Sequence, residues 1–167
     1  MSRAFVKEEN EALTGEELPE RPVSSEPNYV TPAGRESLRM TVEKLQAEHA
    51  HFKRAAEDFN RPNLIRIERD LRYFQSRLES AISVSGAAQP RDEVHFGASV
   101  RTGDESGAIH TFTIVGEDEA DVAHGKVSWQ SPLAAALIGA SVGDTVTWKR
   151  PVGETTLEVL DIKYPTG

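Results

Sequence analysis

The sequence predicts an α+β protein, in which an N-terminal antiparallel helical hairpin (a coiled coil) precedes a small antiparallel β domain with one short helix. Apolar side chains recur at steps of three and four over residues 31–59 and again over residues 64–81. That spacing is typical of two coiled-coil seams. Asn60 and Pro62 separate the two runs. Beyond residue 90 the apolar spacing changes to two, with glycine-containing turns between the runs, which indicates short strands.

The first helix is expected from Pro32 to about Phe59. Thr31 suits the N-cap, because its hydroxyl can accept a hydrogen bond from a free backbone N–H, and proline is favoured at the first helical position. His49 lies on the seam and is interpreted as a partly buried core residue, since the spacing of the histidines matches no metal site. The seam comprises Leu38, Val42, Leu45, His49, Phe52, Ala56 and Phe59.

The second helix is expected from about Pro62 to Ile82. Two helices joined by a short turn can bury matching apolar stripes only by packing antiparallel. The second seam comprises Leu64, Ile67, Leu71, Phe74, Leu78 and Ala81. Five arginines on this helix could form a face for RNA or for an acidic surface, but pairing with acids such as Glu68 and Asp70 is the preferred interpretation. They are Arg61, Arg66, Arg69, Arg72 and Arg77.

Charge is unevenly divided along the chain. Residues 1–30 carry a net charge of −4, residues 31–84 carry +2 and residues 85–167 carry −6, for a total of −8. This balance argues against a general phosphate-neutralising surface for bare nucleic acid. Residues 1–28 are rich in glutamate and proline and predict a disordered acidic tail. Its charge opposes that of the hairpin, which suggests that the tail shields the hairpin.

Four segments are therefore expected: the acidic tail at residues 1–28, the hairpin at 29–84, a small polar linker at 85–90 and the β domain at 91–167. Strands of the β domain are predicted at 94–100, 109–115, 126–129, 145–149 and 156–162. Ser131 and Pro132 are expected to open a short helix over residues 133–138. Trp129 and Trp148 are expected to pack in this domain.

The cellular setting follows from what the sequence lacks. The chain has no cysteine, which excludes disulfides and thiolate metal sites and is compatible with the cytoplasm. The longest apolar stretch, around residues 133–138, is too short to cross a bilayer, and the first residues lack the apolar core of a signal peptide. We therefore expect no membrane partner, and we expect no metal site within the chain itself.

Several blocks follow one another in a recognisable order: residues 112–121, 126–128, 131–139 and 142–144, preceded by 94–100 and by the helix start at 31–34. Together they resemble the bacterial Gre-type (GreA/GreB family) transcription elongation factors, and order and spacing agree from about residue 29 to residue 164. The resemblance implies an FKBP-like C-terminal domain. It also implies a monomeric regulator of transcription elongation that binds RNA polymerase, inserts its hairpin into the secondary channel and contacts RNA and DNA only indirectly.

The resemblance also assigns site residues. Gln130, Ser131 and Pro132 match the loop that docks on the polymerase, although Gln130 stands where relatives often have Asp or Asn. Such factors are accessory proteins without a complete active site or a cofactor of their own. In the family, acids at the hairpin tip help the polymerase hold a second Mg²⁺, which activates a water to cleave backtracked RNA. Carboxylates suit that role, because they are hard oxygen ligands.

The hairpin tip departs from the family pattern. Relatives that stimulate cleavage carry a Gly-Asp-Leu-x-Glu-Asn-Ala-Glu-Tyr type of segment, whereas this chain has the shorter AAEDFNRPNL at residues 55–64. Glu57 and Asp58 are the candidate acids directed at Mg²⁺, and a solvated helix end is the alternative. The factor is therefore expected either to stimulate cleavage or to occupy the channel as a competitor or inhibitor without cleavage.

Two interpretations from other classes remain open. The FKBP-like domain could be a peptidyl-prolyl isomerase or a chaperone-like module, although that function needs an apolar pocket lined by aromatic rings and the aromatic residues here are few and spread along the strands. The helices could instead form a coiled-coil module that assembles with a second copy of the chain.

Overall fold

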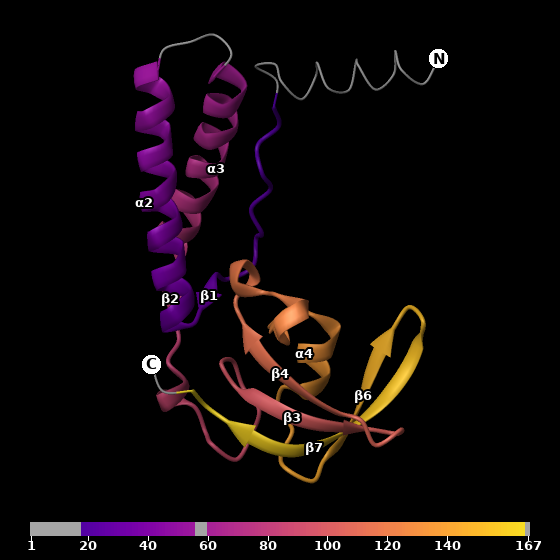
Figure 1. Cartoon of the computed structure of the whole chain (residues 1–167). Coiled ribbons are helices and arrows are strands. Elements are labelled where there is room, and N and C mark those ends of the chain that lie inside the picture. The colour runs from indigo at the N-terminus through magenta and orange to yellow at the C-terminus, as the bar shows by residue number, and fades with distance from the viewer. Residues whose placement is uncertain (1–17, 56–59, 166–167) are drawn as a thin grey trace, which may run out of the picture. The chain divides into compact units, whose positions relative to one another are not determined.

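The computed structural model of this chain describes residues 18–55 and 60–165. It confirms the α+β class, with a helical N-terminal part and a curled sheet that is mainly antiparallel (Figure 1). The chain divides into two compact units, which are described separately. One comprises the described residues up to Glu26 together with Ser37–Ser80, and the other comprises Pro27–Glu36 and the chain from Ala81 onward.

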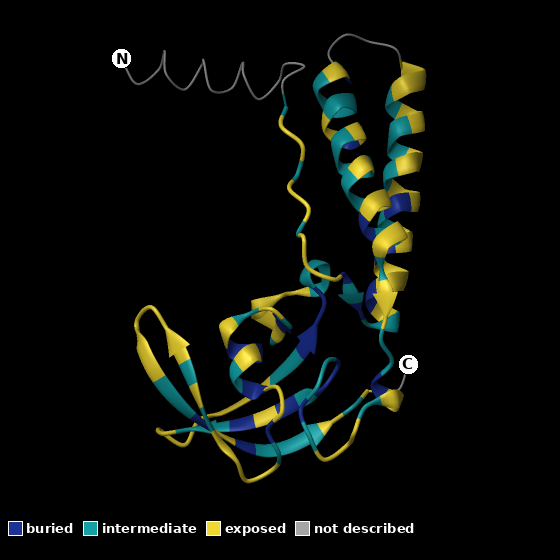
Figure 2. Cartoon of the chain, turned by 180° about the vertical axis from the view of Figure 1, so that it is seen from behind, coloured by how far each residue is buried: buried dark blue, intermediate teal, exposed yellow. Residues whose placement is uncertain are grey.

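The first unit holds the helical hairpin. Helices α2 (Pro32–Ala55) and α3 (Arg61–Ser80) run side by side in both views (Figures 1 and 2). Leu38, Val42 and Ile67 are buried between them, and the other seam residues that the structure describes are half-buried. This pattern confirms the predicted hairpin. The predicted seam residues Ala56 and Phe59 lie outside the described residues.

A polar contact also joins the two helices. His49 Nε2 lies 3.0 Å from Glu68 Oε1. The side chain of His49 is about one quarter exposed, at 26%, which agrees with the prediction of a partly buried, hydrogen-bonded histidine on the seam. The helix α3 ends at Ser80 rather than at Ile82 as predicted, because Ile82 enters a strand.

The second unit begins with a small sheet that the sequence pattern did not predict. Strand β1 (Tyr29–Val30) pairs in parallel with β2 (Ile82–Ser83), so that Tyr29 lies opposite Ile82. Strands of two residues are too short to show a period of two, and their partners are far apart in sequence. Local spacing therefore carries no signal for this pairing. A 3-10 helix, Gly86–Ala88, follows in the segment predicted as the linker.

The main sheet has five strands in the order β5-β4-β3-β7-β6. Its neighbours are antiparallel except for β4 and β5, which pair in parallel. The strands are β3 (Ser99–Asp104), β4 (Ile109–Val115), β5 (Lys126–Ser128), β6 (Thr145–Arg150) and β7 (Gly153–Lys163).

The starts of two strands differ from the prediction, those of β3 and β7. Residues 94–98 are not part of a strand, and Val94 is held by backbone hydrogen bonds to Ala140 and Gly139. Gly97 has a φ of +88°, which L side chains rarely adopt, and this turn delays the start of β3 to Ser99. Strand β7 starts at Gly153, before the predicted start at residue 156. The φ of +130° at Gly153 allows a tight connection from β6.

Helix α4 (Pro132–Leu137) packs with the sheet around the hydrophobic core (Figure 1). Trp129 and Trp148 pack against this core, which confirms their predicted structural role. The buried members of the core are Val94, Ala98, Val100, Ile114, Val127, Leu133, Ala134, Leu137, Ala140, Leu157 and Val159. The likeness to FKBP and the domain boundaries deduced from the sequence stay predictions.

Candidate functional site

The predicted docking loop connects β5 to α4. Ser131 caps the helix, since its Oγ accepts a hydrogen bond from Ala134 N at 3.2 Å. The backbone N–H of Ser131 donates to Ser128 O at 2.9 Å, and that of Gln130 donates to Ser128 Oγ at 3.2 Å. Gln130 and Pro132 are exposed. The loop is therefore fixed by its backbone while the side chain of Gln130 faces solvent, an arrangement that suits contact with a partner.

Aromatic rings pack against one another at the beginning of this loop. The ring of Trp129 meets that of Tyr29 edge to face, with centroids 5.2 Å apart, and Tyr29 also packs on Phe96 at 6.2 Å. Trp129 N donates to Val115 O at 2.9 Å. The buried indole Nε1 of Trp129 has no hydrogen-bond partner among the described residues. The cluster therefore joins β1 to the β5–α4 loop within the second unit.

Glu119 fixes the beginning of α2. Its carboxylate accepts hydrogen bonds from Thr31 N at 3.0 Å, from Gly116 N at 3.1 Å and from the hydroxyl of Thr31. The Thr31 hydroxyl oxygen in turn accepts from Gly34 N at 3.0 Å, which is the predicted N-cap contact. A Cβ at Gly34 would lie 2.0 Å from the Glu119 Cδ atom, so a side chain at that position would displace this carboxylate from its present position. Sequence reasoning missed this role, because Glu119 is far from Thr31 along the chain.

Two helix ends border the predicted tip of the hairpin. Helix α2 ends at Ala55 and α3 begins at Arg61. Asn60, directly before α3, is 6% exposed. The candidate acids Glu57 and Asp58 lie outside the described residues, so their proposed role toward Mg²⁺ stays a prediction.

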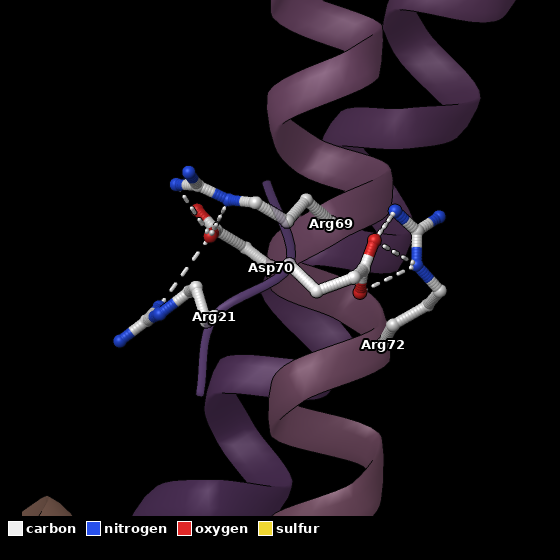
Figure 3. A network of polar contacts seen from close by, with 5 residues as sticks. Arg21, Arg69, Asp70 and Arg72 are labelled. Atoms are coloured by element: carbon white, nitrogen blue, oxygen red, sulfur yellow. Dashed lines mark hydrogen bonds and ion pairs between the residues drawn. The ribbon is translucent and has the colours of Figure 1, made fainter. Parts of the chain in front are cut away.

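The arginines of α3 do not form one continuous basic face. Arg77 is buried at 1% exposure and has polar contacts. Arg69 and Arg72 are paired with the acids Asp70 and Glu20 respectively (Figure 3). Arg66 is exposed. These pairings agree with the interpretation of the arginines as partners of acids, although Glu20 belongs to the predicted tail and not to the helix.

A cavity of about 270 Å³ lies at the ends of the β3–β4 and β6–β7 hairpins. Phe112 meets Trp148 edge to face at 6.2 Å, and the guanidinium of Arg150 lies 4.6 Å from the Trp148 ring centroid. Asp104 and His110 also line it. The aromatic residues are thus gathered by the fold, but charged groups interrupt their surface, which differs from the apolar pocket that binding a prolyl peptide requires.

Asp104 itself has a structural role in the β3–β4 turn. Its Oδ1 accepts hydrogen bonds from Ser106 Oγ at 2.6 Å, from Ser106 N at 2.9 Å and from Ala108 N at 3.0 Å. These bonds, with the Ser106 hydroxyl contributing most, lower the pKa of Asp104 to about 2.

Within residues 18–55 and 60–165, no group of three or more His, Asp or Glu side chains is arranged to hold a metal ion. None of the helices described there is long and apolar enough to cross a membrane.

Comparisons with known proteins agree on one family. Residues 89–164 match the family model "Transcription elongation factor, GreA/GreB, C-term". The transcription elongation factor GreB of Neisseria meningitidis serogroup B is 34% identical over 153 residues, which cover 82% of this chain and 94% of the relative. The transcription elongation factor GreA of Alkalilimnicola ehrlichii is 36% identical over 152 residues, which cover 81% of this chain and 96% of the relative.

A solved GreA/GreB elongation factor from Nitrosomonas europaea covers 82% of this chain and 99% of its own, with 22% identity and a TM-score of 0.41. The sequence matches decide the family, because they cover more than 80% of this chain at more than 30% identity. They also agree with the sequence blocks, which run from the start of the hairpin to the last strand. This chain belongs to the GreA/GreB family of transcription elongation factors.

Proposed function

We propose that this factor binds RNA polymerase and regulates elongation by placing its helical hairpin in the secondary channel. Family membership is the observation that carries the proposal. The factor acts as an accessory protein in the cytoplasm, as a monomer, and any hydrolysis of RNA takes place in the polymerase active site. Its contact with RNA and DNA is indirect, through the elongation complex.

The docking surface in this proposal is the loop of Gln130, Ser131 and Pro132. Ser131 and Pro132 are needed to start α4, and the exposed amide of Gln130 is left to contact the polymerase. An interface residue of this kind acts through its side chain, whereas a helix cap acts on stability. Substitution of Gln130 should therefore change affinity without changing the stability of the fold.

The test is the affinity of Gln130→Arg for bacterial core RNA polymerase. We expect binding to weaken about tenfold, because the long charged side chain must be accommodated at the interface. Thr145→Arg, at an exposed position of β6, is the matched control and should bind like the wild type. Absence of any binding by the wild-type chain at low salt would refute the proposed function itself.

Cleavage stimulation is a separate part of the proposal. Glu57 and Asp58 would direct carboxylates toward the Mg²⁺ of the polymerase, which is the chemistry of a two-metal site. Cleavage of backtracked RNA should then occur with the wild type and be lost with Glu57→Ala/Asp58→Ala. A wild-type factor that binds but supports no cleavage would instead be a channel-occupying competitor.

The competitor is favoured by one observation. The segment between α2 and α3 lacks the Gly-Asp-Leu-x-Glu-Asn-Ala-Glu-Tyr type of sequence that cleavage-stimulating relatives carry. The peptidyl-prolyl isomerase remains the alternative from another class, and clear catalysis of proline isomerisation in a peptide assay would support it. An obligate dimer in equilibrium sedimentation would favour the self-assembling coiled coil.

A further inference from the structure

Residues 18–26 lie in the same compact unit as most of the hairpin. They contain neither a helix nor a strand, yet two consecutive residues of this segment hold α3 through defined polar contacts (Figure 3). We call residues 18–26 the N-terminal strap. They belong to the predicted disordered tail, of which residues 1–17 lie outside the described residues.

Glu20 makes the first contact. Arg72 Nε donates to both carboxylate oxygens of Glu20 at 3.1 Å, and Arg72 Nη2 donates to Oε1. The hydrogen bond from Arg72 lowers the pKa of Glu20, and the same bond raises the pKa of Arg72. This forked geometry is the one in which a guanidinium recognises a carboxylate best.

Arg21 makes the second contact, in which the strap supplies the positive charge and α3 supplies the negative one. Its Nη1 lies 3.4 Å from Asp70 Oδ1, an oxygen that also accepts from Arg69 Nη2 at 3.2 Å. The guanidinium carbon of Arg21 lies 4.1 Å from the ring centroid of Tyr73 and 5.0 Å from that of Phe74. The strap therefore covers an aromatic surface of α3 as well as one of its arginines.

These contacts are suited to release. The side chains of Glu20 and Arg72 are 62% and 55% exposed, and that of Arg21 is 37% exposed. Exposed ion pairs are individually weak and are screened by salt, so that several together hold the strap while none locks it in place. A partner that offers a carboxylate to Arg72 can replace Glu20 by competing for the same guanidinium.

We propose that the N-terminal strap occupies, in cis, a surface of α3 through which the hairpin contacts the polymerase, so that the hairpin binds fully only after the strap has left. The surface consists of Arg72 and the neighbouring Tyr73, and its partner is a carboxylate-bearing protein surface. The inference rests on the proposed function, because it assigns a regulation to the same hairpin. While the strap is bound to α3, Glu20 occupies the position on Arg72 that the partner's carboxylate would take.

Two variants break the same ion pair and are expected to differ in their affinity for the polymerase. Glu20→Gln loosens the strap and leaves Arg72 available, so the affinity for core RNA polymerase should rise about twofold to fivefold, the range that the loss of one exposed ion pair allows. Arg72→Gln also loosens the strap but removes the proposed contact, so its affinity should not exceed that of the wild type. Glu26→Gln is the matched control for charge, since Glu26 is exposed, and it should bind like the wild type.

The position of the strap can be measured without the polymerase. The chain has no cysteine, so spin labels can be placed at two introduced cysteines, Ser25→Cys in the strap and Gln75→Cys on α3, both at exposed positions. Their distance distribution should be narrow in the wild-type background and in Glu26→Gln. It should become longer and broader in Glu20→Gln and in Arg72→Gln, and added salt should broaden it as well.

The outcomes separate the inference from the proposed function. A strap that opens in Glu20→Gln without a gain in affinity would overturn the inference and leave the proposed function standing. An equal gain in Arg72→Gln would overturn the assignment of Arg72 as a contact. If no variant and no wild-type chain binds the polymerase, the proposed function fails and the regulatory inference fails with it, while the spin-label distances still report whether the strap is closed.

Discussion

Removal of the Glu119 carboxylate should release the beginning of α2 from the β domain. The carboxylate accepts hydrogen bonds from Thr31 N, the Thr31 hydroxyl and Gly116 N. Hydrogen bonds to a charged group contribute about 1.5 to 3 kcal/mol each when they are sheltered, and water replaces part of this at a half-exposed site. Because Glu119 is half-exposed, we expect Glu119→Ala to lower the free energy of unfolding by about 2 to 3 kcal/mol, and Glu119→Gln to lower it by about half as much.

The assay is urea unfolding followed by tryptophan fluorescence. Trp129 and Trp148 are the two tryptophans of the chain and both belong to the second unit, so the signal reports on the unit that Glu119 holds together. Glu105→Ala, in an exposed turn, is the matched control for the loss of one negative charge. A double-mutant cycle with Thr31→Val should give a coupling of about 1 kcal/mol or more. Equal effects of the Glu119 and Glu105 substitutions, or a coupling of zero, would refute the role of Glu119.

Two further outcomes follow from the described contacts. Gly116→Ala should be strongly destabilising, by about 3 kcal/mol or more, because its Cβ would lie 2.4 Å from the backbone oxygen of Tyr29; a thermal melt within 2 °C of the wild type would contradict this. The pKa of Asp104 is lowered to about 2 from a usual value of 3.8. The unfolded chain therefore binds more protons at this group between these values, and the contribution of Asp104 to stability is present above about pH 4 and is lost as the pH falls toward 2. Asp104→Asn should flatten the stability profile in that window in acid titrations, and an unchanged slope would contradict the assignment.

Local pattern was enough for the elements whose signal repeats along the chain. The steps of three and four that include Leu38, Val42 and Ile67 predicted the antiparallel hairpin, because a continuous seam admits few other arrangements. Ser131 followed by Pro132 predicted the start of α4, since both residues act on the backbone next to them. The position of the loop at Gln130, Ser131 and Pro132 was therefore predictable from local pattern, whereas its docking role came from the resemblance and stays a prediction.

Contacts between residues that are far apart in sequence left no repeating pattern from which they could be predicted. The pairing of Tyr29 with Ile82 and the bond from Thr31 to Glu119 join segments that only the folded chain brings together. Charge suggested that the acidic tail shields the hairpin, but it could not identify Glu20 and Arg72 as the pair. Many acids and many arginines satisfy the same charge balance, and only geometry selects between them.

The sequence by itself determined the class of the fold, the two seams of the hairpin, the start of α4 and the resemblance that led to the family. These features depend on neighbours along the chain or on the order of blocks, which a linear sequence contains. The tertiary structure alone decided where α2 is anchored, which residues surround Trp129 and which face of α3 the N-terminal strap covers. Each of these depends on distances between residues that are remote in sequence, and chain folding sets those distances.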